Sequence, residues 1–224
     1  MADIFGTPGA DDIVGTLESD NIFGNEGKNI LRGDAGLSGL PIGSSDNIYG
    51  GSQEDEIYGV GGNDSLFGGE GVNTIFGGTG NDLIYSGSGD DSLYGGLGSD
   101  VIYAGEGNNT VYGDTPFGDF PDNGDDIIYT GSGNDTITGG TGNNTIWLGG
   151  GQDVVVLQSG FGANTINNFQ LGSTTFDVLF DPASLAFTDT ANGTEIRLGS
   201  DIVAVVSWQN ASVFTNNLSS IFVD

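Results

Sequence analysis

The sequence predicts an all-β solenoid with about 18 residues per coil, closed at its C-terminal end by a β cap. Three observations favour this fold class: aliphatic residues recur in nine-residue steps, glycine is abundant (43 of 224 residues), and each step places one aliphatic residue between glycine-rich turns. A helix would need three or four apolar residues in every two turns, and each interior glycine would cost it about 1 kcal/mol. One inward residue between glycine turns instead predicts a very short strand, and two such units make one coil.

The solenoid body is expected over residues 1–160. One residue is missing from the nine-residue count between Leu40 and Ile48, and about eight extra residues between Val111 and Ile128 indicate an insertion at about 112–124. The aliphatic series comprises Ile4, Ile13, Ile22, Leu31, Leu40, Ile48, Ile57, Leu66, Ile75, Ile84, Leu93, Ile102, Val111, Ile128, Ile137, Ile146 and Val155.

The C-terminal element is expected over residues 161–224. Glycine becomes scarcer from about Ala163, and the stretch NTINNFQLGSTTFDVLFDPASLAF is typical of longer strands. The segment TEIRLGSDIVAVVSW predicts a β-hairpin that turns at Gly199-Ser200. A solenoid needs such a cap because no neighbouring coil covers its last one.

An acidic or amide residue stands two places before almost every aliphatic residue of the body. Alternate units share a side of a solenoid, so these side chains stack about 4.8 Å apart, and unscreened carboxylates at that spacing repel. Two or three such turns would reflect only the preference of Asp and Asn for glycine turns, but a whole series in register indicates a cation. Oxygen ligands without His or Cys favour Ca²⁺. The predicted metal ligands are Asp11, Asp20, Asn29, Asp46, Asp55, Asp64, Asn73, Asp82, Asp91, Asp100, Asn109, Asp126, Asp135, Asn144 and Asp153.

Neighbouring residues on one side pair to define the expected ions. The Asp/Asp pairs are 46/64, 64/82, 82/100, 100/126 and 135/153, and the Asp/Asn pairs are 11/29, 29/46, 126/144, 55/73, 73/91, 91/109 and 109/135. We therefore expect roughly five strong sites and up to about twelve Ca²⁺ ions in all. Ser38 takes the acidic position of its unit and is expected to interrupt one row.

The charge balance and the missing residue types exclude several classes of function. The chain has 31 acidic and three basic residues, for a net charge of −28, so nucleic acid and anionic membranes are disfavoured as partners. Without His or Cys it has no Ser-His-Asp or Cys-His catalytic system and no typical zinc site. No segment has enough apolar residues to span a membrane. The N-terminus lacks the basic and apolar stretches of a signal peptide, which alone would suggest a cytoplasmic protein.

The nine-residue unit resembles the RTX (hemolysin-type) calcium-binding nonapeptide GGxGxDxUx, in which U is a large aliphatic residue. Close copies are GGEGVNTIF (68–76), GGTGNDLIY (77–85), GGLGSDVIY (95–103) and GGTGNNTIW (139–147), and the resemblance covers about residues 6–156. It implies a parallel β-roll with Ca²⁺ in the turns, bound by Asp and by backbone carbonyls at the second and fourth positions. The implied glycine ligands are Gly69, Gly71, Gly78, Gly80, Gly87, Gly89, Gly96, Gly98, Gly105, Gly107, Gly131, Gly133, Gly140 and Gly142.

The C-terminal region resembles the segment that follows such repeats in proteins exported by the type I secretion machinery. The matching features are an I-x-x-F element at Ile166 to Phe169 and an apolar tail at Ile221 to Val223. The resemblance implies a protein that is secreted or displayed on the cell surface. Its charge and glycine content favour disorder without calcium, so we expect folding at the millimolar calcium found outside cells.

The last position of many units is aromatic and should point outward. Stacking between coils is the simplest role of these two ladders; the alternative is a surface for polysaccharide, the cell surface or self-association. The ladders comprise Tyr49, Phe67, Tyr85, Tyr103, Tyr129 and Trp147 on one side, and Tyr58, Phe76, Tyr94 and Tyr112 on the other.

These patterns together predict a secreted calcium-binding protein with a structural or surface-interaction role. A non-catalytic glycan-binding accessory module is the alternative function. Enzymatic activity is not expected, because the repeats begin within the first dozen residues and the paired carboxylates are assigned to calcium.

Overall fold

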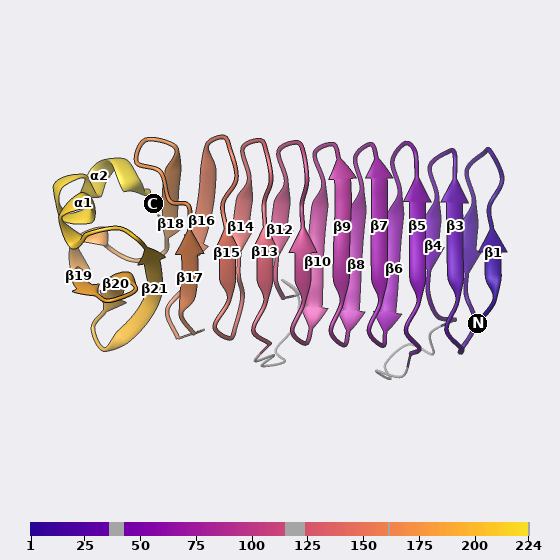
Figure 1. Cartoon of the computed structure of the whole chain (residues 1–224), viewed down its shortest axis with the longest axis horizontal. Helices are drawn as coiled ribbons and strands as arrows, with labels where there is room; N and C mark the ends of the chain where they lie inside the picture. Colours follow the sequence, from indigo (N-terminus) through magenta and orange to yellow (C-terminus); the bar gives the residue numbers. More distant parts are fainter. Residues whose placement is uncertain (36–42, 115–123, 161, 224) are drawn as a thin grey trace.

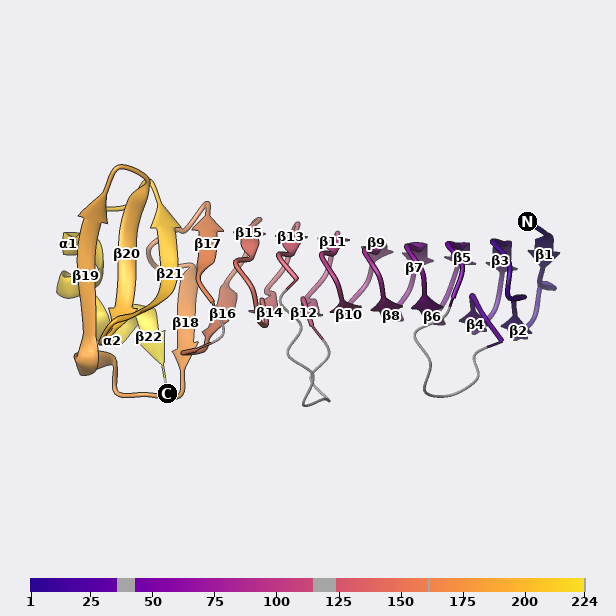
Figure 2. The same cartoon turned by 90° about the horizontal axis from the view of Figure 1, so that it is seen from below.

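A computed structural model describes residues 1–35, 43–114, 124–160 and 162–223. The chain winds into an elongated β-solenoid with the N-terminus at one end and a compact C-terminal cap at the other (Figure 1). Two parallel sheets form its two layers (Figure 2), and successive strands alternate between them. The predicted fold class is confirmed.

The first sheet, called sheet A, contains the odd-numbered strands of the roll and three strands of the cap. Its members in spatial order are β1 (Asp3–Phe5), β3 (Asn21–Asn25), β5 (Asn47–Gly51), β7 (Ser65–Glu70), β9 (Leu83–Ser88), β11 (Val101–Tyr103), β13 (Ile127–Tyr129), β15 (Thr145–Trp147), β17 (Asn164–Asn167), β21 (Asp201–Ser207), β20 (Gly193–Leu198) and β19 (Leu185–Thr190).

The second sheet, called sheet B, contains the even-numbered strands of the roll and the short last strand of the chain. Its members in spatial order are β2 (Asp12–Val14), β4 (Ile30–Arg32), β6 (Glu56–Gly61), β8 (Thr74–Thr79), β10 (Ser92–Leu97), β12 (Thr110–Tyr112), β14 (Thr136–Thr138), β16 (Asp153–Leu157), β18 (Thr174–Val178) and β22 (Phe222–Val223).

The core of the roll is a stack of aliphatic side chains between the two sheets. Each pairs in register with its counterpart one coil away, as Ile84 does with Leu66 and Ile102. From Ile22 to Val155 the described members of the predicted series are fully buried. Since each coil contributes only two of these residues, a single coil cannot bury its apolar surface, and stability comes from stacking.

The strand order contradicts one detail of the predicted repeat. The nine-residue count makes Leu40 a unit of its own, but β5 pairs with β3 and β6 pairs with β4. The offset from Asn21 to Asn47 is 26 residues, against 18 between regular neighbours such as Asp64 and Asp82. The turn between β4 and β5 therefore contains an insertion of the same size as the one between β12 and β13. Leu40 and Ser38 themselves lie outside the described residues.

The cap continues both sheets and then encloses their end. β17 and β18 stack in parallel on β15 and β16, and β21 joins β17 in parallel. β20 and β21 form the predicted antiparallel hairpin around Gly199-Ser200, and β19 adds a third strand. The short helices η1 (Pro182–Ser184), α1 (Ala211–Asn216) and α2 (Leu218–Ile221) complete it. An aromatic cluster replaces the aliphatic stack here; its rings belong to Phe169, Phe176, Phe187, Phe214 and Phe222.

Within the described ranges, no helix has the length and apolar character that crossing a membrane requires.

Candidate metal centre

The predicted metal ligands form two straight rows, one along each edge of the roll. The row on the lower edge of Figure 1 lies in the turns that enter sheet A, and the row on the upper edge lies in the turns that enter sheet B. The lower row consists of Asp20, Asp46, Asp64, Asp82, Asp100, Asp126 and Asn144. The upper row consists of Asp11, Asn29, Asp55, Asn73, Asp91, Asn109, Asp135 and Asp153.

One hydrogen bond links each member of a row to the next. The backbone amide of each residue donates to Oδ1 of its counterpart in the following coil, as Asp64 N does to Asp82 Oδ1 at 2.8 Å. These bonds also correct the pairing on the N-terminal side. Asp20 pairs with Asp46 and Asn29 pairs with Asp55, so the predicted 29/46 pair is wrong because the insertion between β4 and β5 shifts the count.

The Asn members of the upper row satisfy their second polar atom within their own turn. The Nδ2 amide of Asn29 donates to Gly27 O at 2.9 Å, and those of Asn73 and Asn109 donate to the carbonyls of Gly71 and Gly107 at 3.3 and 3.2 Å. Each acceptor is the glycine two residues earlier, at the fourth position of the repeat. The Asn turns are therefore closed by their own hydrogen bonds.

The Asp members put an oxygen where the Asn members put an amide. A Cβ built on Gly50 would lie 2.6 Å from Asp55 Oδ2, and one built on Gly68, in the next coil, would lie 2.9 Å from Asn73 Nδ2. A carboxylate oxygen cannot donate to the glycine carbonyl, and within the described residues several of these buried Oδ2 atoms have no hydrogen-bond partner. They belong to Asp46, Asp55, Asp64, Asp82, Asp91 and Asp135.

Burial disfavours the charged form of these carboxyl groups unless a cation lies next to them. It raises the pKa of Asp64 to about 8, and the charges of Asp82 and Asp46 add to the effect. It also raises the pKa of Asp82 to about 6. The pKa values of Asp46, Asp55 and Asp135 rise to about 6 for the same reason. Desolvation penalises the charged form, and a stacked neighbour of the same sign adds repulsion.

The protein's own cations do not neutralise the rows. Lys28 forms an ion pair with Glu54, and Arg197 pairs with Glu195 at 2.7 Å. Arg32 pairs with Asp12 at 2.5 Å and lies 5.5 Å from the ring of Tyr58. These are all the basic side chains of the sequence, so compensation of the buried carboxylates must come from solution.

The donor set of the rows fits Ca²⁺. Successive turns supply stacked carboxylates together with backbone carbonyls of the glycine loops, and hard oxygen donors of this kind suit Ca²⁺. The glycines predicted as carbonyl ligands all have positive φ, for example +99° at Gly69 and +104° at Gly71. In the described part of the chain no cluster of three or more acidic side chains gathers, so each ion would depend on carbonyls as well as on carboxylates.

The N-terminal coil is an exception. Asp20 Oδ2 accepts hydrogen bonds from the amide and the hydroxyl of Thr16, both at 2.7 Å. Although burial acts to raise its pKa, the bonds from Thr16 and from the Ala2 amide hold the pKa of Asp20 below its usual value. Thr7 donates to Asp11 in the same way, at 2.6 Å from its amide. A second-position Thr thus donates to the carboxylate and lessens its dependence on a cation at this end.

Sequence reasoning missed two acids, the buried Asp34 and the partly buried Asp114. Both follow the first glycine of a turn that carries an insertion, in the segments RGD and YGD. Asp34 is almost fully buried and accepts from the amide and hydroxyl of Ser44 at 3.1 and 3.3 Å. Asp114 accepts from the amide and hydroxyl of Thr141 at 2.6 and 2.9 Å. The signal that could have found them is an Asp at the second position, where the repeat prefers glycine.

The aromatic residues form two stacked ladders on the outer faces. From Phe5 to Tyr129 the rings on sheet A lie 4.6 to 5.4 Å apart, and Trp147 follows at 6.3 Å. On sheet B the rings from Tyr58 to Tyr112 lie 4.7 to 5.1 Å apart. Ring planes within each ladder are nearly parallel, so the faces cover one another and mainly the edges meet solvent.

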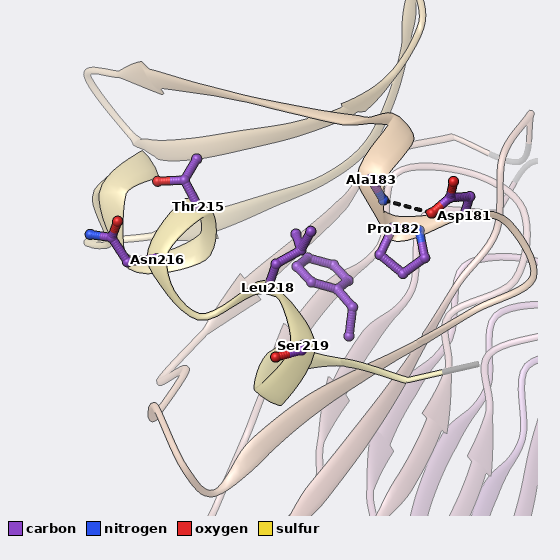
Figure 3. A pocket seen from close by; sticks show the side chains of 8 residues that line it. Asp181, Pro182, Ala183, Thr215, Asn216, Leu218 and Ser219 are labelled. Carbon is purple, nitrogen blue, oxygen red and sulfur yellow. Dashed lines mark hydrogen bonds between the residues drawn. The ribbon is translucent and has the colours of Figure 1, made fainter.

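The cap contains a separate cavity of about 520 Å³ between η1 and the two short α-helices (Figure 3). Its lining combines apolar and small polar side chains, and its one carboxylate, Asp181, accepts a hydrogen bond from Ala183 N at 2.9 Å and so caps η1. The lining residues are Asp181, Pro182, Ala183, Thr215, Asn216, Leu218, Ser219 and Phe222. With its acid engaged in a cap, this cavity offers little for catalysis.

Comparison with known families agrees with the geometry of the rows. The family model of the RTX calcium-binding nonapeptide repeat (4 copies) matches residues 5–37, 43–75, 67–102, 85–115 and 120–155. A search of curated proteins found no match.

Proposed function

The chain belongs to the RTX calcium-binding nonapeptide repeat family, and on that premise we propose that it is a secreted β-roll protein that folds as it binds multiple Ca²⁺ ions. Its role is structural or surface-interacting, and it is not catalytic. The ions are the protein's structural cofactor, and they lie between successive turns of the two rows.

One observation carries the proposal: the contrast between Asp and Asn at equivalent places in the rows. Asn73 Nδ2 donates to a glycine carbonyl, whereas Asp55 Oδ2 and Asp91 Oδ2, one coil away on either side, have no hydrogen-bond partner among the described residues. A buried oxygen facing other oxygens requires either a proton or a cation. At neutral pH and millimolar Ca²⁺, an ion satisfies several such oxygens at once.

The free energy of ion binding then contributes directly to the free energy of folding. The rows exist only when neighbouring coils are stacked, because each ion draws its ligands from turns 18 or 26 residues apart in sequence. A chain with a net charge of −28 and 43 glycines favours disorder until that charge is neutralised. Calcium therefore acts as the switch between a disordered chain and the roll.

The test is a far-UV circular dichroism titration of metal-free protein with Ca²⁺ at pH 7.5, with Mg²⁺ as the control ion. We expect a cooperative transition from coil to β structure with Ca²⁺ only, because Mg²⁺ demands regular octahedral geometry and gives up its water reluctantly. A β-rich spectrum before calcium is added would contradict the proposal, as would an equal response to Mg²⁺.

The burial of the secretion-like residues supports the proposal that export comes before folding. Ile166, Phe169 and Ile221 are buried in the cap, and Phe169 packs against Phe176 and Phe214. An export machinery could recognise them only in the unfolded chain, which low cytosolic calcium would preserve. Replacing Phe169 by Ala should reduce the amount exported by cells carrying a type I exporter. Unchanged export would remove this support for secretion.

The ladders favour the structural role over glycan binding. A sugar stacks on the face of an aromatic ring, but here neighbouring rings cover most faces, and Tyr85 lies between Phe67 and Tyr103 at 5.4 and 4.6 Å. A pulldown with anionic polysaccharides, repeated with Tyr85→Ala and Tyr103→Ala, separates the two functions. Binding by the parent protein that both substitutions abolish would favour the glycan-binding module.

A further inference from the structure

We propose that Asp34 and Asp114 are additional calcium ligands, which take the place of a backbone carbonyl where the two insertions displace it. The inference rests on the proposed function, since it assumes that the lower row binds Ca²⁺. It concerns residues outside the nine-residue pattern of ligands.

In a regular turn, the second position presents its carbonyl to the next coil. The third-position amide of that coil donates to it, as Glu106 N does to Gly87 O at 2.9 Å and Ser132 N does to Gly105 O at 3.0 Å. This second-position carbonyl belongs to the donor set described above. An insertion that starts just after the second position separates that residue along the chain from the rest of its turn.

At the second insertion a carboxylate, in place of a backbone carbonyl, accepts the hydrogen bond of the third-position amide. Thr141 is the third-position residue of the coil after Asp114, and its amide donates at 2.6 Å to Asp114 Oδ2, a side-chain oxygen. A Cβ on the preceding glycine, Gly140, would overlap with the same carboxylate. The side chain of Asp114 thus lies where the backbone oxygen of a regular turn would lie.

At the first insertion the carboxylate joins the two ends of the interrupted turn. Asp34 precedes the insertion, and its oxygens accept from Ser44, which follows it at the fourth position of the repeat. The Ser44 hydroxyl also lies 3.4 Å from Asp46 Oδ1. Asp34 and Asp46 are each about 1% exposed, so two buried carboxylates meet at the base of one insertion.

An unsatisfied carboxylate oxygen lies in the same turn region, close to Gly33, the residue before Asp34. Asp46 Oδ2 has no hydrogen-bond partner within the described residues, and it lies 2.5 Å from the place of a Cβ on Gly33, the residue next to Asp34. The Gly59 carbonyl lies 2.6 Å from the same place. Carboxylates of Asp34 and Asp46 with neighbouring carbonyl oxygens form a donor set for a divalent cation of the Ca²⁺ type.

An ion at each place would act as a clip across its insertion. Closing a loop costs entropy that grows with loop length, and a metal that joins the two ends offsets this cost in the folded state. The lower row would then run past both insertions without losing an ion, although the turn backbone is interrupted twice.

The test counts ions bound to the full-length protein. Equilibrium dialysis with metal analysis is performed on the parent protein and on Asp34→Asn, Asp114→Asn and Asp90→Asn, with folding of each sample followed by circular dichroism. Asp90 is the matched control because it is exposed at the fifth position, where Asn63, Asn81 and Asn108 stand in other coils. We expect Asp34→Asn and Asp114→Asn each to bind one ion fewer and to fold at higher calcium, and Asp90→Asn to match the parent.

Calcium is raised until the β signal of each variant equals that of the parent, so that ions are counted on folded protein. Equal ion counts and equal calcium midpoints for Asp34→Asn and the parent would overturn the inference. An equal shift in Asp90→Asn would also overturn it, because the effect would then be one of general charge. Failure of the parent itself to bind calcium would reject the proposed function instead.

Discussion

Acidifying the metal-free protein should reproduce part of the effect of calcium. Burial raises the pKa of Asp64 to about 8 and that of Asp82 to about 6, from ordinary values of 3.8. Because the folded state has the higher pKa values, it holds protons that the unfolded chain releases. The stability that these protons contribute is fully present below about pH 4, and it is lost as the pH rises through about 6 and then about 8.

The size of the effect follows from these two groups alone. One pKa unit corresponds to about 1.4 kcal/mol, so at pH 7.5 the two carboxyl groups destabilise the metal-free fold by roughly 8 kcal/mol, and at pH 5.0 by roughly 3 kcal/mol. The whole stability of a typical domain is about 5–15 kcal/mol. The difference of about 5 kcal/mol changes the folding equilibrium several-thousand-fold. We choose pH 5.0 because it lies above the isoelectric point of about 4.1.

The assay is far-UV circular dichroism at pH 7.5 and pH 5.0 on protein freed of metal beforehand. The parent should gain β structure at pH 5.0 without calcium. The double variant Asp64→Asn/Asp82→Asn should show more β structure than the parent at pH 7.5, because Asn closes such turns by its own hydrogen bond, as Asn73 does. Asp90→Asn/Asp125→Asn, which alters two exposed acids, is the control. A parent spectrum that is the same at both pH values would refute the reasoning.

Three further substitutions, two of them with a matched control, test the packing; the urea measurements are made in saturating calcium. Ile84 lies in the fully buried stack, and Ile84→Ala should lower the free energy of unfolding in urea by about 2–5 kcal/mol. Ile127 is 37% exposed, and Ile127→Ala should lower it by less than about 1 kcal/mol. Equal losses for the two variants would contradict the inward-facing aliphatic stack. Gly80→Ala should raise the calcium midpoint of folding, because Gly80 has a φ of +120° and its Cβ would overlap with a carbonyl of the preceding coil. Gly150→Ala is the control and should leave the calcium midpoint unchanged, because a Cβ on Gly150 meets nothing within 4 Å. Tyr103→Ala should cost about 1–3 kcal/mol, since it removes two stacking contacts of 4.6 and 4.7 Å; an unchanged urea midpoint would show that the ladder contributes nothing to stability.

The sequence was sufficient to predict the strands, because each depends on a local pattern. An aliphatic residue between glycine turns has one inward direction in a strand, so positions such as Ile84 and Ile102 could be placed without knowing their neighbours. The hairpin around Gly199-Ser200 was predictable for the same reason. The aromatic ladders followed from the same period.

The pairing across the first insertion could not be predicted from the sequence. The gap from Leu31 to Ile48 has the same length as the gap from Val111 to Ile128, and each can be a short unit or an insertion. Leu40 stands where an inward residue would stand, which favoured the wrong choice. Only backbone pairing, with Asn21 opposite Asn47, separates the two, since that contact is not local in sequence.

The Thr residues that donate to Asp11 and Asp20 at the N-terminal end show a similar limit. Asp11 and Asp20 match the ligand pattern as well as any other Asp of the rows. What distinguishes them is the hydroxyl of Thr7 or Thr16 four residues earlier, at a position where most turns have glycine. A pattern of ligands therefore indicates where an ion can bind, but the other residues of the turn decide how strongly the carboxylate depends on one.

The two rows differ in how strongly the stacking of their turns depends on calcium. From Asp20 to Asp126 every member of the lower row is an Asp, whereas in the upper row Asp and Asn alternate from Asp11 to Asp135. Every second turn of the upper edge is closed by an Asn amide bound to a glycine carbonyl, so its carboxylates are about two coil spacings, or roughly 10 Å, apart. Carboxylates of the lower edge are one spacing apart, and mutual repulsion there falls only when cations lie between them. The lower edge should therefore depend on calcium more strongly than the upper edge, and it is the same edge that carries both insertions.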